Sequence, residues 1–177
     1  MSIGLLTSSM LFFSCNNTFE EISDSVDYTR YPSETANNIE IVQTDSGKIE
    51  LKIFAPILER FSIEDEQAYE EFKKGLEVLT YSEYPEISSS LTCEYAIHLV
   101  DSNVWEARDN VVVINIDGDT ILTEQMFWDN ETHRIYSDKF VNIRSETQTI
   151  YGKGFTAKDD GTGWKINNIR GDFYLEE

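Results

Sequence analysis

Two aspartates that flank a glycine, Asp117 and Asp119, form the string most similar to a metal-binding loop. Alternating carboxylates in a short loop are the ligands that Ca²⁺ prefers, and a glutamate further along usually closes the coordination sphere. No glutamate stands at that distance here, and Asp-Gly is also typical of a tight hairpin turn. The string is therefore interpreted as a turn, and no metal ligand is predicted.

Catalysis needs a nucleophile, a base and an orienting group brought together in one site. The sequence contains no G-x-S-x-G, H-E-x-x-H or G-x-x-x-x-G-K motif, and His98 and His133 are each isolated among polar residues. Cys93 lies in a strand-like run, where a lone cysteine is typical of a small core residue. We therefore predict no catalytic residue, no cofactor and no enzymatic activity.

The elements that position these residues are predicted to be strands. In residues 107–155, short runs of Val, Ile, Phe, Tyr and Trp are separated by Asp-Gly and Asp-Asn pairs, as in hairpins. Similar residues also recur about 30 positions apart, as in Trp105 and Ile135 or Val111 and Val141, with a looser third copy at Trp164. The recurrence indicates stacked hairpin units, although chance matches at hairpin spacing are the alternative.

The residues upstream of this region continue the pattern. Residues 39–55 predict a first hairpin around the turn at Asp45, Ser46 and Gly47, because apolar and charged residues alternate in 49–53, and Pro56 is expected to end it. Residues 75–82 and 91–100 predict two further strands. The charged residues 64–74 fit one or two helical turns by composition. The chain is therefore predicted to be an all-β domain with one short uncertain segment.

The N-terminus has the composition of a targeting segment. Residues 1–15 are an apolar run that ends in Ser14 and Cys15, which predicts a lipoprotein-type signal peptide with Cys15 as the lipid-attachment residue. Phe12 in place of the usual leucine and the lack of a basic residue depart from that signal, and an uncleaved apolar terminus is the alternative. Residues 16–38 are acidic and predict a tether, followed by a β-domain over residues 39–177.

The charge of the chain restricts its partners. Fourteen basic and 33 acidic residues among 177 give a net charge of −19, which would repel the phosphate backbone of a nucleic acid. Hydrophobic residues make up 40%, so the chain still has enough apolar surface to fold around a core. Nucleic acid is therefore excluded as a partner.

Several short motifs occur in the order found in one known family. A-x-x-N-V-V-V-x-N-x-D-G-x-x-I-L-T-x-x-M-x-W-D begins at Ala107, I-Y-S-D-x-x-V-x-I begins at Ile135, and G-x-G-F begins at Gly152. Upstream are Asp-Ser-Gly at 45–47, Ala-Pro at 55–56 and E-F-x-x-G-L at 71–76. Together they resemble the LptC family, the periplasmic component of the lipopolysaccharide export machine, over residues 39–173.

The resemblance implies a fold and a role. The fold would be a folded antiparallel sheet, jelly-roll-like and of the OstA/LptA type, with an open apolar groove. The chain would be anchored at the periplasmic side of the inner membrane, through an acyl anchor if Cys15 is lipidated. It would accept lipopolysaccharide from the subunits of the inner-membrane ABC transporter and pass it, through its edge strands, to a periplasmic LptA-like bridge protein. The alternative is a non-enzymatic β-sandwich lipoprotein that acts as a structural or protein-interaction module.

The candidate groove residues are the apolar residues of the repeated region. Any of them could equally be an ordinary core residue, and a bulge near residues 138–140 would move later side chains to the other face. The predicted lipid-binding set is Val111, Val113, Leu122, Met126, Trp128, Ile135, Val141, Ile143 and Phe155.

Overall fold

The structure, a computed structural model, describes residues 31–62 and 67–170, and every regular element in these residues is a β-strand. No helix among them is long and apolar enough to cross a membrane. The predicted signal peptide with Cys15, and most of the predicted tether, lie outside the described residues. The strands are β1 (Glu34–Asp45), β2 (Lys48–Phe61), β3 (Tyr69–Phe72), β4 (Leu76–Glu83), β5 (Glu86–Cys93), β6 (Tyr95–Leu99), β7 (Val104–Ile114), β8 (Thr120–Asp129), β9 (Arg134–Arg144), β10 (Thr149–Lys158) and β11 (Lys165–Arg170).

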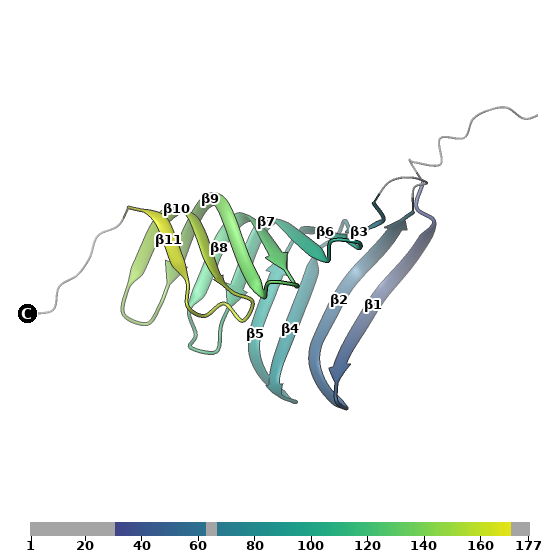
Figure 1. Ribbon diagram of the computed structural model, residues 1–177, viewed down its shortest axis with the longest axis horizontal. Helices are drawn as coiled ribbons and strands as arrows, with labels where there is room; N and C mark the ends of the chain where they lie inside the picture. The colour runs from purple at the N-terminus through teal and green to yellow at the C-terminus, as the bar shows by residue number, and fades with distance from the viewer. Residues whose placement is uncertain (1–30, 63–66, 171–177) are drawn as a thin grey trace, which may run out of the picture.

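All of these strands belong to one antiparallel sheet, so the predicted all-β fold class is confirmed. From β7 onward each strand pairs with the next one along the chain, and β1 and β11 are the two edges of the sheet. Figure 1 shows the result as an elongated, twisted sheet, with β1 and β2 at one end and β11 at the other. Position in the sequence therefore corresponds to position along the long axis.

The sheet is folded along a line that crosses its long strands. Residues 51–54 of β2 pair with β4, whereas residues 59–61 of the same strand pair with β3. In β7, residues 112–114 pair with β5 and residues 104–108 pair with β6. Each long strand thus runs through two layers. We call the layer that contains β4 and β5 the first layer and the layer that contains β3 and β6 the second layer.

Backbone irregularities mark the bend between the layers. Asp109 and Asn110 of β7 have φ values of 61° and 51°, at the point where the register with β8 shifts. In β10, Gly154 has a φ of 78° where the register with β9 shifts. Extra residues and left-handed conformations let a strand turn sharply without ending. A bulge of the kind considered near residues 138–140 is present in β9, where residues 137 and 140 pair with residues only two apart in β10. Val141 and Ile143 beyond it nevertheless remain on the buried inner face.

Pro56 also lies on this line, and the prediction that it ends the first hairpin is wrong. β2 continues through Pro56 to Phe61. Its neighbours Ala55 and Ile57 pair with β1, but Pro56 has no partner in the ladder, and Asn38 opposite it has a φ of 50°. Proline cannot donate a backbone hydrogen bond, so it is tolerated where the ladder is already interrupted by the bend.

Three other expectations about the strands need correction. The helical turns considered for residues 64–74 are wrong for residues 67–74, the part that the structure describes, because β3 lies there and pairs with β2 and β6. The strand expected over residues 91–100 is divided at Glu94 into β5 and β6, which lie in different layers. β1 begins at Glu34, so the last residues of the predicted tether belong to the sheet.

The recurrence about 30 residues apart corresponds to rows of the folded sheet. Trp128 pairs with both Trp105 and Ile135, and Thr123 pairs with both Val111 and Val141. Residues that match in sequence therefore occupy equivalent places on alternate strands. The prediction of stacked hairpin units is confirmed for this part of the chain.

Candidate functional site

The inner faces of the two layers carry most of the predicted lipid-binding residues. Each buried residue of the set has an exposed fraction of 3% or less, and all belong to one apolar cluster that joins the layers. Trp128 is partly buried and packs against this cluster. The buried members are Val111, Val113, Met126, Ile135, Val141, Ile143 and Phe155.

Leu122 is the exception, because it lies on the outer face. Its neighbours in the ladder are Val112 and Asn142, and these three residues line a cleft on that side. Ile121, which is fully buried, occupies the inner position instead and pairs with Val113 and Ile143. Leu122 is therefore not part of the inner lining.

A narrow cavity lies between the layers near the middle of the sheet. Its volume is about 30 Å³, and four predicted residues contribute to its wall together with residues of β4 and β5. Such a space holds about two water molecules and is too small for an acyl chain, so a chain requires the layers to separate or side chains to turn. The lining is Val78, Thr80, Ser89, Ser90, Leu91, Val113, Met126, Trp128, Ile135 and Asp159.

Residues of β4 and β5 were missed as candidates for this lining. Val78 and Leu91 face each other across the ladder, and both line the cavity. The alternation of Leu76, Val78 and Thr80 with polar or outward residues is the signal that could have identified them. The sequence repeat covers only the C-terminal strands, although β4 and β5 contribute half of the wall.

Two hydrogen bonds join the layers where the strands end. The buried side chain of Asn115 donates from Nδ2 to the Gly161 carbonyl at 3.3 Å, and Trp164 Nε1 donates to Asp119 Oδ2 at 3.1 Å. Asn115 Oδ1 also accepts from the backbone nitrogens of Asp117 and Asp119. The Asp117 to Asp119 string is thus a turn organised by Asn115, as the turn interpretation predicts.

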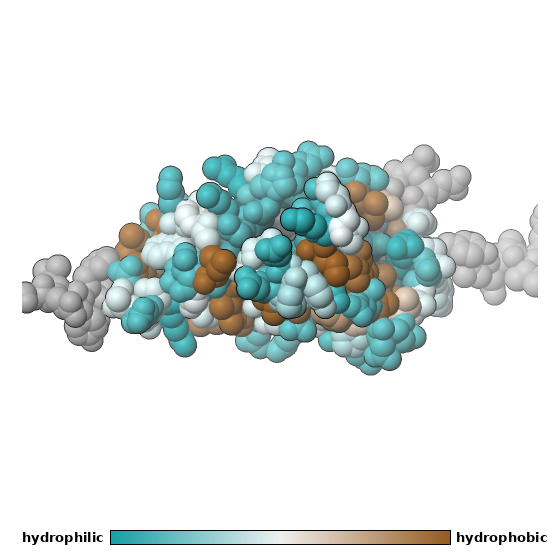
Figure 2. All heavy atoms as spheres, turned by 90° about the horizontal axis from the view of Figure 1, so that it is seen from below, coloured by the Kyte–Doolittle hydropathy of each residue, from teal (hydrophilic) through white to brown (hydrophobic). Residues whose placement is uncertain are grey.

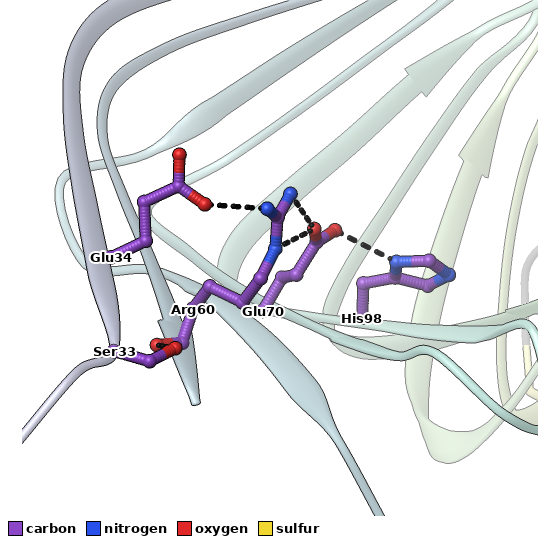
Figure 3. A network of polar contacts seen from close by, with 5 residues as sticks. All are labelled: Ser33, Glu34, Arg60, Glu70 and His98. Carbon is purple, nitrogen blue, oxygen red and sulfur yellow. Dashed lines mark hydrogen bonds and ion pairs between the residues drawn. The ribbon is translucent and has the colours of Figure 1, made fainter. Parts of the chain in front are cut away.

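A polar row lies at the opposite end of the second layer, shown in Figure 3. Arg60 donates to Glu34 at 2.6 Å and to Glu70 at 2.7 Å, and Glu70 bonds His98 Nδ1 at 3.0 Å. His98 stacks on Trp105, with ring centroids 4.2 Å apart. Because Arg60, Glu70, His98 and Trp105 are successive partners across the ladder, the row lies on the same face as the apolar cluster.

We expect this row to make the stability of the domain depend on pH. The hydrogen bond with His98 lowers the pKa of Glu70 below its ordinary 4.5, and Arg60 lowers it further, against the opposing effect of burial. A carboxyl whose pKa is lower in the folded state stabilises the fold above its unfolded pKa and loses that contribution as pH falls. We expect the free energy of unfolding to fall below about pH 4.5 and the Glu70→Gln variant to show a shallower fall in urea titrations. Equal slopes for both proteins would contradict this expectation.

The inner face remains apolar and exposed at both edges of the sheet. Ile41 of β1 pairs with the buried Ile53 and is 38% exposed, and Ile169 of β11 pairs with the buried Gly152 and is 53% exposed. Neither edge strand has a second partner among the described residues. Apolar surface therefore continues from one edge, through the interior, to the other. Figure 2 shows one side of the molecule, where brown apolar residues gather in the middle among polar ones.

The cysteine and the two histidines considered as reactive residues have contacts that explain them structurally. Cys93 is buried in the apolar cluster, and burial raises the pKa of its thiol to about 11, so it stays a thiol at neutral pH. His133 is exposed in the turn after β8 and bonds Asp159 Oδ2 at 2.9 Å. His98 is held by Glu70 and by the stacked Trp105. These contacts give the three residues roles in packing and in turns.

Comparison with known families agrees with this architecture. The family described as "Lipopolysaccharide-assembly, LptC-related" matches residues 3–169, which is nearly the whole chain. No curated protein matches the chain. The family is a component of lipopolysaccharide transport that is associated with the inner membrane in the periplasm, and it is not a known enzyme family. The chain, with its folded antiparallel sheet, belongs to the LptC-related family of lipopolysaccharide-assembly proteins.

Proposed function

We propose that the chain carries the acyl chains of lipopolysaccharide between the two layers of its folded sheet. In this role it accepts the lipid from the inner-membrane ABC transporter and passes it to a periplasmic bridge protein. The observation that carries the proposal is the inner apolar face, which runs from β1 to β11 and is exposed at both edges. A closed domain core would be covered at its ends, whereas a conduit needs them open.

The energetics of loading favour an external source of work. Ten buried methylenes contribute on the order of 8 kcal/mol relative to water, enough to outweigh screened repulsion between the acidic chain and an anionic headgroup. Moving the same chain from a bilayer replaces one apolar surrounding with another and yields little. The cavity of about 30 Å³ also has to widen. The transporter is therefore the proposed source of the energy, and no nucleotide site is expected in this chain.

The proposal places the two ends of the sheet against different partners. Acylation at Cys15 would anchor the chain on the periplasmic side of the inner membrane, so β1, the first strand after the tether, faces the transporter subunits. β11 at the far edge then offers its unpaired backbone groups to the bridge protein, since an exposed edge can accept another strand. This arrangement gives transport a direction along the long axis.

The tight packing of the interior favours a second function. The small cavity and the low exposure of Val111, Val141 and Phe155 also fit a filled core, as in a β-sandwich lipoprotein that acts as a protein-interaction module. Such a module would use its surface alone, and its interior would never admit a lipid. The two functions therefore differ in what the cavity wall contacts in cells.

Photo-crosslinking at adjacent aromatic residues separates the two functions. Trp128 lines the cavity, whereas Phe127 stacks on Tyr136 on the outer face of the same strand. With a photoreactive phenylalanine at either position, we expect lipopolysaccharide adducts at 128 and a yield at least about tenfold lower at 127, since only the inner face touches acyl chains. Adducts at neither position in a folded, membrane-associated protein would favour the interaction module.

A further inference from the structure

The charges of the chain are sorted along the long axis of the sheet. Residues 134–170, which include β9, β10 and β11, contain seven basic and four acidic residues. The rest of the chain contains the other seven basic residues and 29 acidic ones. Because sequence position follows the axis, the described residues at the β11 end carry a net charge of +3 in a protein whose total is −19. Asp172, Glu176 and Glu177, which follow in the sequence, are counted with the rest of the chain.

The basic side chains at the two ends also differ in their partners. Towards β1, Lys52 pairs with Glu40 at 2.9 Å and Arg60 pairs with Glu70 at 2.7 Å. Arg134, Arg144, Lys153, Lys158 and Lys165 are all exposed, and none forms an ion pair with any other residue in the part of the chain that the structure describes. Their charges are therefore available to an anionic partner.

Aromatic residues on the outer surface accompany these free charges, and a cleft extends from them to the β11 edge. Phe140 is 56% exposed and stacks on Tyr151, with ring centroids 6.2 Å apart. A cleft of about 750 Å³ beside them is lined by Lys139, Phe140, Gly152, Lys153, Asn167, Asn168 and Ile169. Exposed aromatic side chains are enriched in protein interfaces, and basic side chains beside them can provide charge complementarity to an acidic partner. We call Phe140, Tyr151, Lys153 and Lys165 the basic docking surface.

The position of these residues favours a polypeptide as the occupant. Phe140 and Lys153 pair with each other on the outer face, away from the apolar interior, so a lipid between the layers does not reach them. β11 presents an unpaired edge, which a strand fills and a free anion does not. A strand added there would lie about 4.8 Å from β11 and about 9.6 Å from β10, within reach of the lysines at 165 and 153.

We propose that the partner which adds a strand to β11 carries carboxylates at alternating, outward-facing positions of that strand, and that the basic docking surface recognises them. This inference rests on the proposed function, in which the partner is the bridge protein. It adds how the partner is recognised. Backbone pairing with β11 provides the affinity, and the basic docking surface selects a partner whose edge strand is acidic. The acidic N-terminal part of this chain would repel such a partner, so the partner is directed to the β11 end.

The first test compares association with the bridge protein of the same organism for two charge reversals. Lys153→Glu with Lys165→Glu is expected to weaken Kd on the order of tenfold at low salt, with a smaller difference at high salt, because exposed charges are screened. The matched control is Lys48→Glu, an exposed lysine in the hairpin at the far end, which should leave Kd unchanged. An unchanged melting temperature in all variants shows that the fold is intact.

Replacement of the partner's edge carboxylates by lysines should then restore binding to the reversed variant, and this rescue supports direct recognition. Equal binding by wild type and the double reversal, or a bridge protein whose edge strand has no alternating carboxylates, would overturn the inference. Lipid adducts at position 128 are measured separately. Adducts without charge-dependent association would overturn this inference alone, and absent adducts would overturn the proposed function.

Discussion

Replacement of Gly152 by valine is expected to detach β11 from the sheet. A Cβ atom at this position would lie 2.7 Å from the backbone oxygen of Asn168 and would also collide with Cγ2 of Ile166. The side chain of Ile166 can turn, but the backbone of the neighbouring strand cannot yield without breaking its ladder. Overpacking of this kind typically costs about 1–3 kcal/mol, and β11 is held in the described sheet by β10 alone.

Hydrogen exchange detects the release directly. In the wild type, the β11 amides that pair with β10 should be protected, and in Gly152→Val we expect the protection of residues 165–170 to fall at least about tenfold. Thr156→Val is the matched control, because it places valine on the same strand, opposite Lys165, without adding heavy atoms to the side chain already there. Full protection of β11 in Gly152→Val would show that the sheet absorbs the extra atoms.

The variant also separates the two halves of the proposed function. Loss of β11 removes the edge for the partner, but Trp128 lies in β8, which is separated from β11 by β9 and β10, and should be unaffected. We therefore expect lipid adducts at position 128 to persist while association with the bridge protein is lost. The Gly152→Val variant is thus expected to load lipid but to fail in its transfer to the bridge protein.

Much of the fold follows from local patterns. The turns at Asp45 to Gly47, at Asp117-Gly118 and at Asp129-Asn130 follow from the sequence, because Asp with Gly or Asn favours tight hairpins. Residues 69–72 are different, since their charged composition fits a helix while their partners in β2 and β6 select a strand. Pairing with these strands overrides the local helical preference, and the pairing cannot be inferred from composition alone.

The lining was harder to predict because the bend changes side-chain parity. Counting back by twos from Trp128 and Met126 leads to Leu122, and this count is the natural one for a straight strand. In β8, however, residues 124 and 125 cross the bend, so the inner positions continue at Thr123 and Ile121. Only the register with neighbouring strands shows this shift, so sequence alternation alone could not choose between two adjacent apolar residues.

Asn115→Ala is expected to give the second large effect, on the closure between the layers. Asn115 is 5% exposed and holds three partners, the backbone nitrogens of Asp117 and Asp119 and the carbonyl of Gly161. Removal of the amide leaves the two backbone N–H donors and the Gly161 carbonyl without this hydrogen-bond partner. We therefore expect a loss of about 3 kcal/mol in the free energy of unfolding. Urea denaturation measures this loss.

Asn115→Asp divides that loss between the turn and the contact across the layers. A carboxylate keeps the acceptor for Asp117 and Asp119 but cannot donate to Gly161, and its oxygen would instead face that carbonyl. We therefore expect protected amides at 117 and 119 in Asn115→Asp, exchanging amides in Asn115→Ala, and an intermediate stability of the aspartate variant. If closure between the layers limits lipid access, Asn115→Asp should also raise the adduct yield at position 128. Equal destabilisation by both substitutions with equal adduct yields would instead assign Asn115 to the turn alone, and the closure would then depend on the bond between Trp164 and Asp119.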